Sequence, residues 1–340
     1  MAGGGFKEER SNLLMLAHVV PDPGGPGRRA RAWQLLAMLA EHYHIDLLCA
    51  AGGPVHLTQW RQVHRIARKL QIEPGATADH NASNEHVIDP RRFAATARQW
   101  CGNTSYDAVL VTHARLAPLL GGLDSPHRIC DLASLASASA RRLAASRRGL
   151  VRARCLAQVR RHLAAESRAA ALANLITVSH PTGARHAAPA EGRLLVVPPG
   201  VDTRSLDEIA PAPDFHLGGD PRLAVLIDPT ERTQRHAART FLGTTWPAVQ
   251  QHVPGVKLDV VPITIAAQWR KTVAHATAVA IPGTSPLAGR WPMLQAMALG
   301  KPVLLSREAA ASLPVRHRRN ALLAAHPADW VDQSVEALTS

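Results

Sequence analysis

The chain has 340 residues, of which 46% are hydrophobic and 19% are charged, a balance typical of a folded protein and not of a disordered one. This length is enough for two domains of ordinary size. The net charge of +13, from 39 basic and 26 acidic residues, favours anionic partners, although a general bias toward arginine explains the excess equally well.

Several classes of protein are excluded by the same composition. The four cysteines lie far apart and form no Cys-x-x-Cys pair, which argues against a disulfide framework and a cysteine-based zinc site. No run of about 18 apolar residues predicts a transmembrane helix, and the polar N-terminus has no signal-peptide core. We therefore expect a cytoplasmic protein.

The first elements in chain order form one βαβ unit. An apolar run over residues 13–18 predicts a buried strand, and residues 19–29 form a loop rich in proline and glycine. Apolar residues at helical spacing follow over residues 30–40, and a second strand is predicted over residues 44–51. This order implies a parallel sheet.

The alternation of helices and strands continues to the C-terminus. Helices are predicted over residues 57–68, 90–101, 138–174, 234–253 and 266–274, and strands over residues 107–112, 127–131, 175–179, 194–197, 223–227, 257–261 and 278–281. A linker containing proline and acidic residues, 205–220, separates two α/β halves. The predicted organisation is an N-terminal domain over 1–204, a C-terminal domain over 205–325 and a last helix over 326–340 that packs back on the body.

The first loop contains Gly24 and Gly25 between a predicted strand and a predicted helix. Backbone N–H groups at a helix N-terminus bind anions, and glycine lets a phosphate approach closely. The loop does not have the Gly-x-Gly-x-x-Gly order, so an ordinary βα turn remains the simpler interpretation of these two residues alone.

A family resemblance rests on three segments. Residues 196–202, VVPPGVD, resemble the V-I-P-N-G-V-D turn of GT-B glycosyltransferases of the retaining group 1 family, and residues 296–303, AMALGKPV, resemble that family's E-A-M-A-x-G-x-P-V segment. The opening βαβ, with Arg-Ala-x-x-Leu-Leu at 31–36, is similar to a bacterial branch of sugar transferases associated with exopolysaccharide and exosortase systems. Asp131 and Glu166 match that branch as well. The resemblance covers residues 12–335.

The resemblance implies an α/β fold of the GT-B type, with two Rossmann-like domains whose parallel sheets face a central cleft. It implies transfer of a sugar from a nucleoside diphosphate donor to a polysaccharide or lipid-linked acceptor. The donor is then a substrate, and we expect no cofactor; the absence of an Asp-x-Asp motif agrees with a reaction that needs no metal. Because residues 261–278 are short for the family, the C-terminal domain is expected to be reduced.

The resemblance also implies where the donor binds. The candidates on the donor side are Arg232, Gly283, Thr284, Arg290 and Gln295, and the candidates facing them from the other domain are Gly24, Gly25 and Arg28. Cationic side chains and helix N-termini at these positions would stabilise the leaving diphosphate.

Two positions depart from the family's Glu-x7-Glu motif. Gln295 replaces the glutamate that binds the donor ribose; it keeps an acceptor oxygen but loses the charge. Leu287 replaces the glutamate that contacts the donor sugar, and its side chain supplies neither a hydrogen-bond acceptor nor a charge. The alternative function is therefore a catalytically impaired relative that acts as a binding or scaffold protein in a polysaccharide system.

Three further features are weighed against simpler interpretations. His113 ends a predicted strand where some relatives carry a functional histidine, and it is the candidate catalytic residue, although a chance strand-end histidine is the commoner case. Glu166 lies among arginines and is most simply half of an ion pair.

Nine arginines between Arg141 and Arg168 would suit an anionic membrane surface on the inner face of the plasma membrane, or a solvated helix face. Nucleic acid is not expected, because no nucleic-acid-binding motif accompanies the charge.

Overall fold

The computed structural model describes residues 10–23, 25, 27–51, 55, 57–74, 89–133, 135–145, 147–180, 193–203, 206, 209, 220–229, 232–263, 266–283, 290–310, 313 and 315–339. The chain forms two compact units: Met1–Asp22 with Arg31–Pro198, and Pro23–Ala30 with Pro199–Ser340. The change of unit after Pro198 lies six residues before the predicted boundary at 204/205. The short segment Pro23–Ala30 groups with the second unit, whereas the sequence-based prediction placed it in the N-terminal domain.

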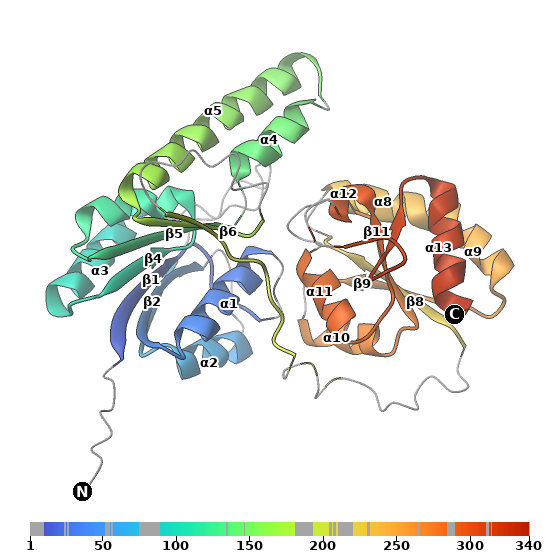
Figure 1. Ribbon diagram of the computed structural model, residues 1–340, viewed down its shortest axis with the longest axis horizontal. Coiled ribbons are helices and arrows are strands. Elements are labelled where there is room, and N and C mark those ends of the chain that lie inside the picture. Colours follow the sequence, from blue (N-terminus) through green and yellow to red (C-terminus); the bar gives the residue numbers. More distant parts are fainter. Residues whose placement is uncertain are drawn as a thin grey trace, which may run out of the picture. The chain divides into compact units, whose positions relative to one another are not determined.

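The first unit contains one seven-stranded sheet in the order β3-β2-β1-β4-β5-β6-β7, and every neighbouring pair is parallel. Its strands are β1 (Ser11–Ala17), β2 (Tyr43–Ala51), β3 (Lys69–Pro74), β4 (Ala108–Val111), β5 (His127–Ala133), β6 (Leu175–Val178) and β7 (Arg193–Val196). Its helical elements are α1 (Arg28–Leu39), α2 (Leu57–Ile66), α3 (Pro90–Asn103), the 3-10 helix η1 (Ala114–Gly122), α4 (Ala136–Ala145) and α5 (Gly149–Leu172). Figure 1 shows this unit in blue to yellow-green.

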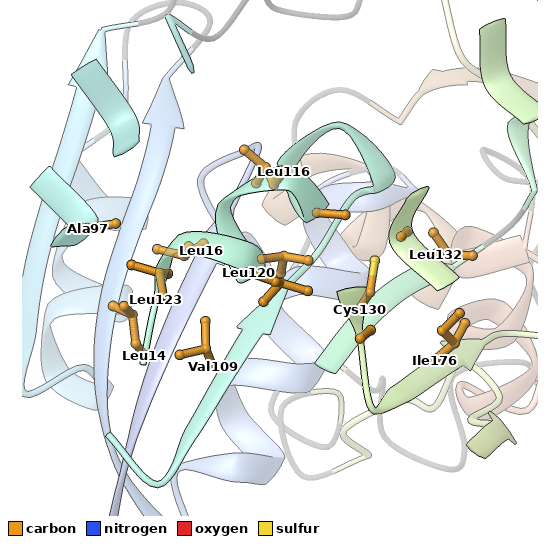
Figure 2. Close-up of a cluster of buried hydrophobic side chains, with 14 of the residues drawn as sticks. Leu14, Leu16, Ala97, Val109, Leu116, Leu120, Leu123, Cys130, Leu132 and Ile176 are labelled. Carbon is orange, nitrogen blue, oxygen red and sulfur yellow. The ribbon is translucent and has the colours of Figure 1, made fainter. Parts of the chain in front are cut away.

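The central strands are buried on both faces. Along β1, Leu14 and Leu16 point into one apolar cluster, whereas Leu13 and Met15 point into another on the opposite face of the sheet. This alternation is the two-residue period of a strand. Figure 2 shows the first cluster, where side chains from β1, β4, β5 and β6 meet those of η1. A strand that is buried on both faces has a continuous run of apolar residues, so it is easy to predict from the sequence.

The helix predicted over residues 138–174 is in fact two helices. α4 ends at Ala145 and α5 begins at Gly149, whose φ of +57° is in the left-handed region that glycine tolerates best. The two helices pack against each other as a hairpin (Figure 1). The apolar spacing alone does not reveal this break, because it resumes at once beyond the turn.

The second unit contains a five-stranded sheet in the order β12-β11-β10-β8-β9, again with every neighbouring pair parallel. Its strands are β8 (Arg222–Ile227), β9 (Lys257–Pro262), β10 (Ala278–Ile281), β11 (Val303–Ser306) and β12 (Leu322–Ala324). Its helical elements are α8 (Arg232–Thr240), the π-helix η3 (Phe241–Thr245), α9 (Trp246–His252), α10 (Ala266–Ala274), α11 (Arg290–Ala298), α12 (Arg307–Ala310) and α13 (Pro327–Thr339).

The C-terminal helix α13 packs on the second unit. Ala337 and Leu338 are buried in an apolar cluster with Val225 of β8, and the ring of Trp330 meets Phe241 edge-on, with centroids 5.6 Å apart. This helix therefore covers one face of the second sheet.

Asp46 of β2 is a buried carboxylate that joins this strand to Arg68, just before β3, and to Tyr106, just before β4. It accepts a two-pronged contact from Arg68, with Nε at 2.8 Å and Nη2 at 2.9 Å, and a hydrogen bond from the Tyr106 hydroxyl at 2.7 Å. Burial raises the pKa of Asp46, but the hydrogen bonds from Arg68 and Tyr106 and the charge of Arg68 together outweigh burial, so the net shift is downward.

We expect Asp46→Asn to destabilise the chain at neutral pH by about 1.5–3 kcal/mol, because the hydrogen bonds to a charged group are weakened. A lowered pKa means that this stabilisation is present above the unfolded value near 3.8 and is lost as the pH falls through the folded value. Urea midpoints of both proteins at pH 7 and in strong acid test this. A gap between the two proteins that persists unchanged in acid would contradict it.

Candidate functional site

Each sheet has one point where the strand order reverses. In the first sheet this point lies between β1 and β4, and in the second between β8 and β10. The loops that follow two such strands leave in opposite directions, which opens a crevice at the carboxyl ends of the strands, and ligands of open parallel sheets bind there. The residues directly after these four strands are therefore the first candidates.

In the first unit, two histidines meet at this point. His18 follows β1 and His113 follows β4, and their ring centroids are 4.6 Å apart. His18 Nδ1 lies 3.1 Å from the Thr112 hydroxyl, and its backbone N–H donates to the same oxygen at 3.4 Å. His113 Nδ1 accepts from the Arg115 N–H at 3.1 Å, where it caps η1, so in the neutral ring the proton is on Nε2. The predicted catalytic histidine is thus held in a fixed tautomer beside a second imidazole.

A buried ion pair lies on β5, the strand next to β4. Arg31 of α1 donates to Asp131 of β5 from Nη2 at 2.9 Å and from Nε at 3.2 Å, and the two side chains are 6% and 0% exposed. The Thr177 hydroxyl of β6 donates to Asp131 Oδ1, and Arg31 Nη1 also reaches the Pro198 carbonyl at 3.4 Å. Through Arg31, Asp131 therefore fixes α1 and the residues that follow β7 to the interior strand β5.

Among the described residues Glu166 forms no ion pair, and its carboxylate has other partners than the arginine that the sequence suggested. Its carboxylate accepts from the Ser137 N–H at 3.0 Å and from the Ser137 hydroxyl at 2.5 Å, and the residue is 8% exposed. A carboxylate at the first turn of α4 satisfies a backbone donor that the helix leaves without a partner. Glu166 therefore joins α5 to the start of α4 at the base of the α4–α5 hairpin.

In the second unit, Gln234 and Gly283 lie together where the strand order reverses. Gln234, in the first turn of α8, is 3% exposed and its Oε1 accepts from the Asp228 N–H, just after β8, at 2.7 Å. Gly283 follows β10, and a Cβ there would lie only 2.7 Å from Gln234 Cγ. Glycine at 283 is required by this close approach and not by an unusual φ. The predicted residue Gly283 therefore lies at the expected edge of the sheet.

A buried polar contact of the second unit joins Arg270 and Gln295. Arg270 of α10 donates from Nε to Gln295 Oε1 at 2.7 Å and from Nη2 to the Pro23 carbonyl at 2.6 Å. Gln295 of α11 is 1% exposed, and its Nε2 donates to the same carbonyl at 3.4 Å. Since Pro23 belongs to the segment that groups with this unit, the glycine-rich loop, α10 and α11 meet at one buried guanidinium. This group stays cationic at any ordinary pH.

The structure describes the other predicted residues only in part. Gly25 is buried and Arg28 is the first residue of α1. Arg232 and Arg290 begin α8 and α11, whose N-termini suit an anion, while their side chains lie outside the described atoms. Gly24, Thr284 and Leu287 lie outside the described residues.

Three residues of these clusters were missed by the sequence analysis. His18, Arg270 and Gln234 belong to no motif in this chain. Two of them have a positional signal, since His18 directly follows a strand and Gln234 stands in the first turn of a helix. Arg270 has none, because its role appears only when α10 packs beside α11.

Among the described residues, no group of three or more histidine, cysteine, aspartate or glutamate side chains is arranged to hold a metal ion. Nor is any helix in the described part of the chain long and apolar enough to cross a membrane.

No protein-family model and no curated protein matches this sequence. Solved structures do. Sucrose-phosphate synthase from Thermosynechococcus elongatus aligns with 97% of this chain and 90% of its own, at 14% identity and a TM-score of 0.62. HepE from Anabaena, in complex with UDP and glucose, aligns over the same shares at 12% identity and a TM-score of 0.63. A putative UDP-N-acetylglucosamine 2-epimerase from Listeria monocytogenes aligns with 98% of this chain and 89% of its own, at 11% identity and a TM-score of 0.56.

These neighbours establish the fold class. The chain is an α/β protein of the GT-B-like class, built from two units that each contain a parallel sheet. At such low identity the neighbours' substrates are properties of those proteins alone.

Proposed function

We propose that this protein transfers a sugar from a nucleoside diphosphate donor to a polysaccharide or lipid-linked acceptor. The observation that carries the proposal is the buried Arg270–Gln295 contact, because Gln295 stands at the position of the donor-binding glutamate in the segment that resembles retaining group 1 glycosyltransferases. The GT-B-like fold supports it, and so do neighbours solved with UDP or UDP-glucose, namely HepE from Anabaena and an alpha-glucosyltransferase.

The chemistry follows from charge. When the glycosidic bond between the sugar and the β-phosphate breaks, negative charge builds up on the diphosphate, and a fixed cation in a place shielded from water stabilises it. We assign this role to Arg270, with Arg232 and Arg290 at the starts of α8 and α11 as further phosphate contacts. We assign Gln295, Gly283 and Thr284 to the donor side as well, and we propose that Gly24 and Gly25 of the first loop and Arg28 at the start of α1 contact the donor. With arginines and helix N-termini supplying the charge, we propose a reaction without an essential metal.

His113 is the proposed catalytic residue. In the tautomer that its cap contact selects, Nε2–H can donate to a hydroxyl of the donor sugar or to the acceptor. Since such a contact tightens as the reaction proceeds, it affects turnover more than donor binding.

We expect His113→Ala to lower kcat about 100-fold, the lower end of what a positioned acid or base contributes, while donor affinity changes little. Release of nucleoside diphosphate from a panel of sugar nucleotides, followed at saturating donor, measures this. His64→Ala on the exposed face of α2 is the matched control and should behave as wild type. An equal loss in both variants, or a loss confined to donor affinity, would remove His113 from the reaction.

The second candidate is a catalytically impaired relative that binds a glycan or a partner enzyme in a polysaccharide system. It is favoured by Gln295, whose neutral amide occupies the position of an acidic residue and is engaged by Arg270. Donor turnover by the wild-type chain decides for the enzyme. Turnover that appears only in a Leu287→Glu, Gln295→Glu double variant decides for the impaired relative.

A lipid-linked acceptor would require a membrane as a further partner. If the acceptor is lipid-linked, the protein works at a membrane, and we propose that the arginine-rich stretch between Arg141 and Arg168 meets an anionic membrane surface on the cytoplasmic side. This stretch forms the α4–α5 hairpin, whose surface is described next.

A further inference from the structure

The α4–α5 hairpin carries an exposed positive charge that no acid on its surface offsets. The described arginine side chains are all exposed: Arg141, Arg147, Arg148, Arg152, Arg154, Arg160, Arg161 and Arg168. The only acid between Leu132 and Ala190 is Glu166, which is turned inward to Ser137. No ion pair to these arginines occurs among the described residues.

Large aliphatic side chains are exposed at the tip of the same hairpin. Leu143 near the end of α4 is 40% exposed, and in the first two turns of α5 Leu150 is 82%, Val151 52% and Leu156 44% exposed. Isolated exposed leucines are common on proteins, but four exposed aliphatic side chains within 14 residues concentrate apolar surface at this end of the hairpin. We call residues 143–156 the hairpin tip.

The base and the tip of the hairpin differ in how they are held. Near the base, Ala169 and Ala170 are buried in the core of the first unit and Glu166 binds the start of α4. Nearer the tip, the buried side chains of α5 are Cys155 and Val159. At 100° per residue, Arg154, Arg161 and Arg168 form a stripe roughly opposite that buried face. Figure 1 shows the two helices projecting together from the sheet of the first unit.

We propose that the hairpin tip inserts into the headgroup layer of an anionic lipid bilayer. Leu150 and Val151 would reach the boundary of the acyl chains while the surrounding arginines contact lipid phosphates, the combination that interfacial helices use. The proposed function names an anionic membrane surface as a partner, and this inference names the residues that would contact it. It rests on the surface of the hairpin alone and holds or fails whether or not the chain turns over a donor.

Two other occupants fit the surface less well. A nucleic acid would match the arginines, but it offers phosphates and base edges at the places where the tip presents aliphatic side chains. A second copy of the chain would cover the aliphatic patch, but it would bring the two sets of arginines together without an acid between them.

Co-sedimentation with vesicles tests the proposal. Vesicles of phosphatidylcholine alone are compared with vesicles containing one third phosphatidylglycerol, at low and high salt. We expect binding only to the anionic vesicles, weakened by salt. Arg147→Gln with Arg148→Gln should lower the affinity about 30-fold, as expected for two basic residues at an anionic surface. Leu150→Glu with Val151→Glu should abolish binding.

Matched controls separate the hairpin from general charge. Arg91→Gln with Arg98→Gln removes two exposed arginines from α3, and Leu57→Ser removes an exposed leucine from α2; both variants should bind vesicles as wild type does. The proposal is overturned if the wild type ignores anionic vesicles, or if the α3 pair weakens binding as much as the hairpin pair. It is also overturned if the tip variants lose binding to duplex DNA or lose a dimer instead. A cooperative thermal unfolding transition at the wild-type temperature confirms that the tip variants are folded.

Discussion

Asp131→Ala is expected to lower the free energy of unfolding of the first unit by about 3–5 kcal/mol, because it leaves a buried guanidinium without a counter-charge. Arg31 is 6% exposed at its side chain, so water cannot solvate the charge that Asp131 now balances. The Thr177 hydroxyl loses its acceptor at the same time. Calorimetry of the full chain should show the transition of this unit moving down by many degrees.

Two comparisons make this result specific. An Arg31→Met, Asp131→Leu double variant should recover most of the loss, since removing both charges of a buried pair is far less costly than removing one. Asp220→Ala, which breaks the exposed pair with Lys257, should leave stability close to that of the wild type, because water and salt screen an exposed pair. If Asp131→Ala lowers the free energy of unfolding no more than Asp220→Ala does, the ion pair does not hold α1 on β5.

Arg270→Ala is expected to weaken binding of the nucleoside diphosphate about 10–100-fold, the range for a lost hydrogen bond between charged groups. Arg270→Lys should recover part of the affinity, since lysine keeps the charge but cannot reproduce the planar fork that reaches Gln295 and Pro23. Isothermal titration with the nucleotide and with its sugar conjugate measures the effect.

Lys271→Ala is the control for Arg270→Ala, because it removes an exposed cation from the next position of α10. It should leave the affinity unchanged. Arg270→Ala also removes contacts to Gln295, so its melting temperature without ligand must be compared with that of the wild type. Unchanged nucleotide affinity in a folded Arg270→Ala variant would take Arg270 out of the donor site.

The sequence predicts the fold well where strands are buried on both faces. β1 and β4 are continuous apolar runs between turn residues, so their place in a parallel sheet follows from the pattern. β3 was not predicted, because an edge strand such as KLQIEP needs few apolar residues and shows no clear period. The break between α4 and α5 was missed because it rests on the backbone of Gly149 and leaves the apolar spacing undisturbed on either side.

The candidate site is predictable only to the level of loops. Strand ends can be located from the pattern, which is how His113 was chosen, whereas Gly283 was chosen from the family resemblance. The partners of such residues are set by packing between distant segments. His18 and His113 are 95 positions apart, and Arg270 and Gln295 are 25 apart, so no local pattern relates them. Glu166 shows the converse, since its neighbours in sequence suggested an ion pair, whereas the fold turns it toward Ser137.

The central claim is that the chain binds a nucleoside diphosphate sugar, and a thermal-shift titration tests it most directly. UDP, GDP, ADP and their common sugar conjugates would each be titrated with and without EDTA. A ligand that binds only the folded state raises the melting temperature. The account predicts a saturable rise with one nucleotide that EDTA does not change and that Arg270→Ala diminishes. No rise with any nucleotide at millimolar concentration would contradict it.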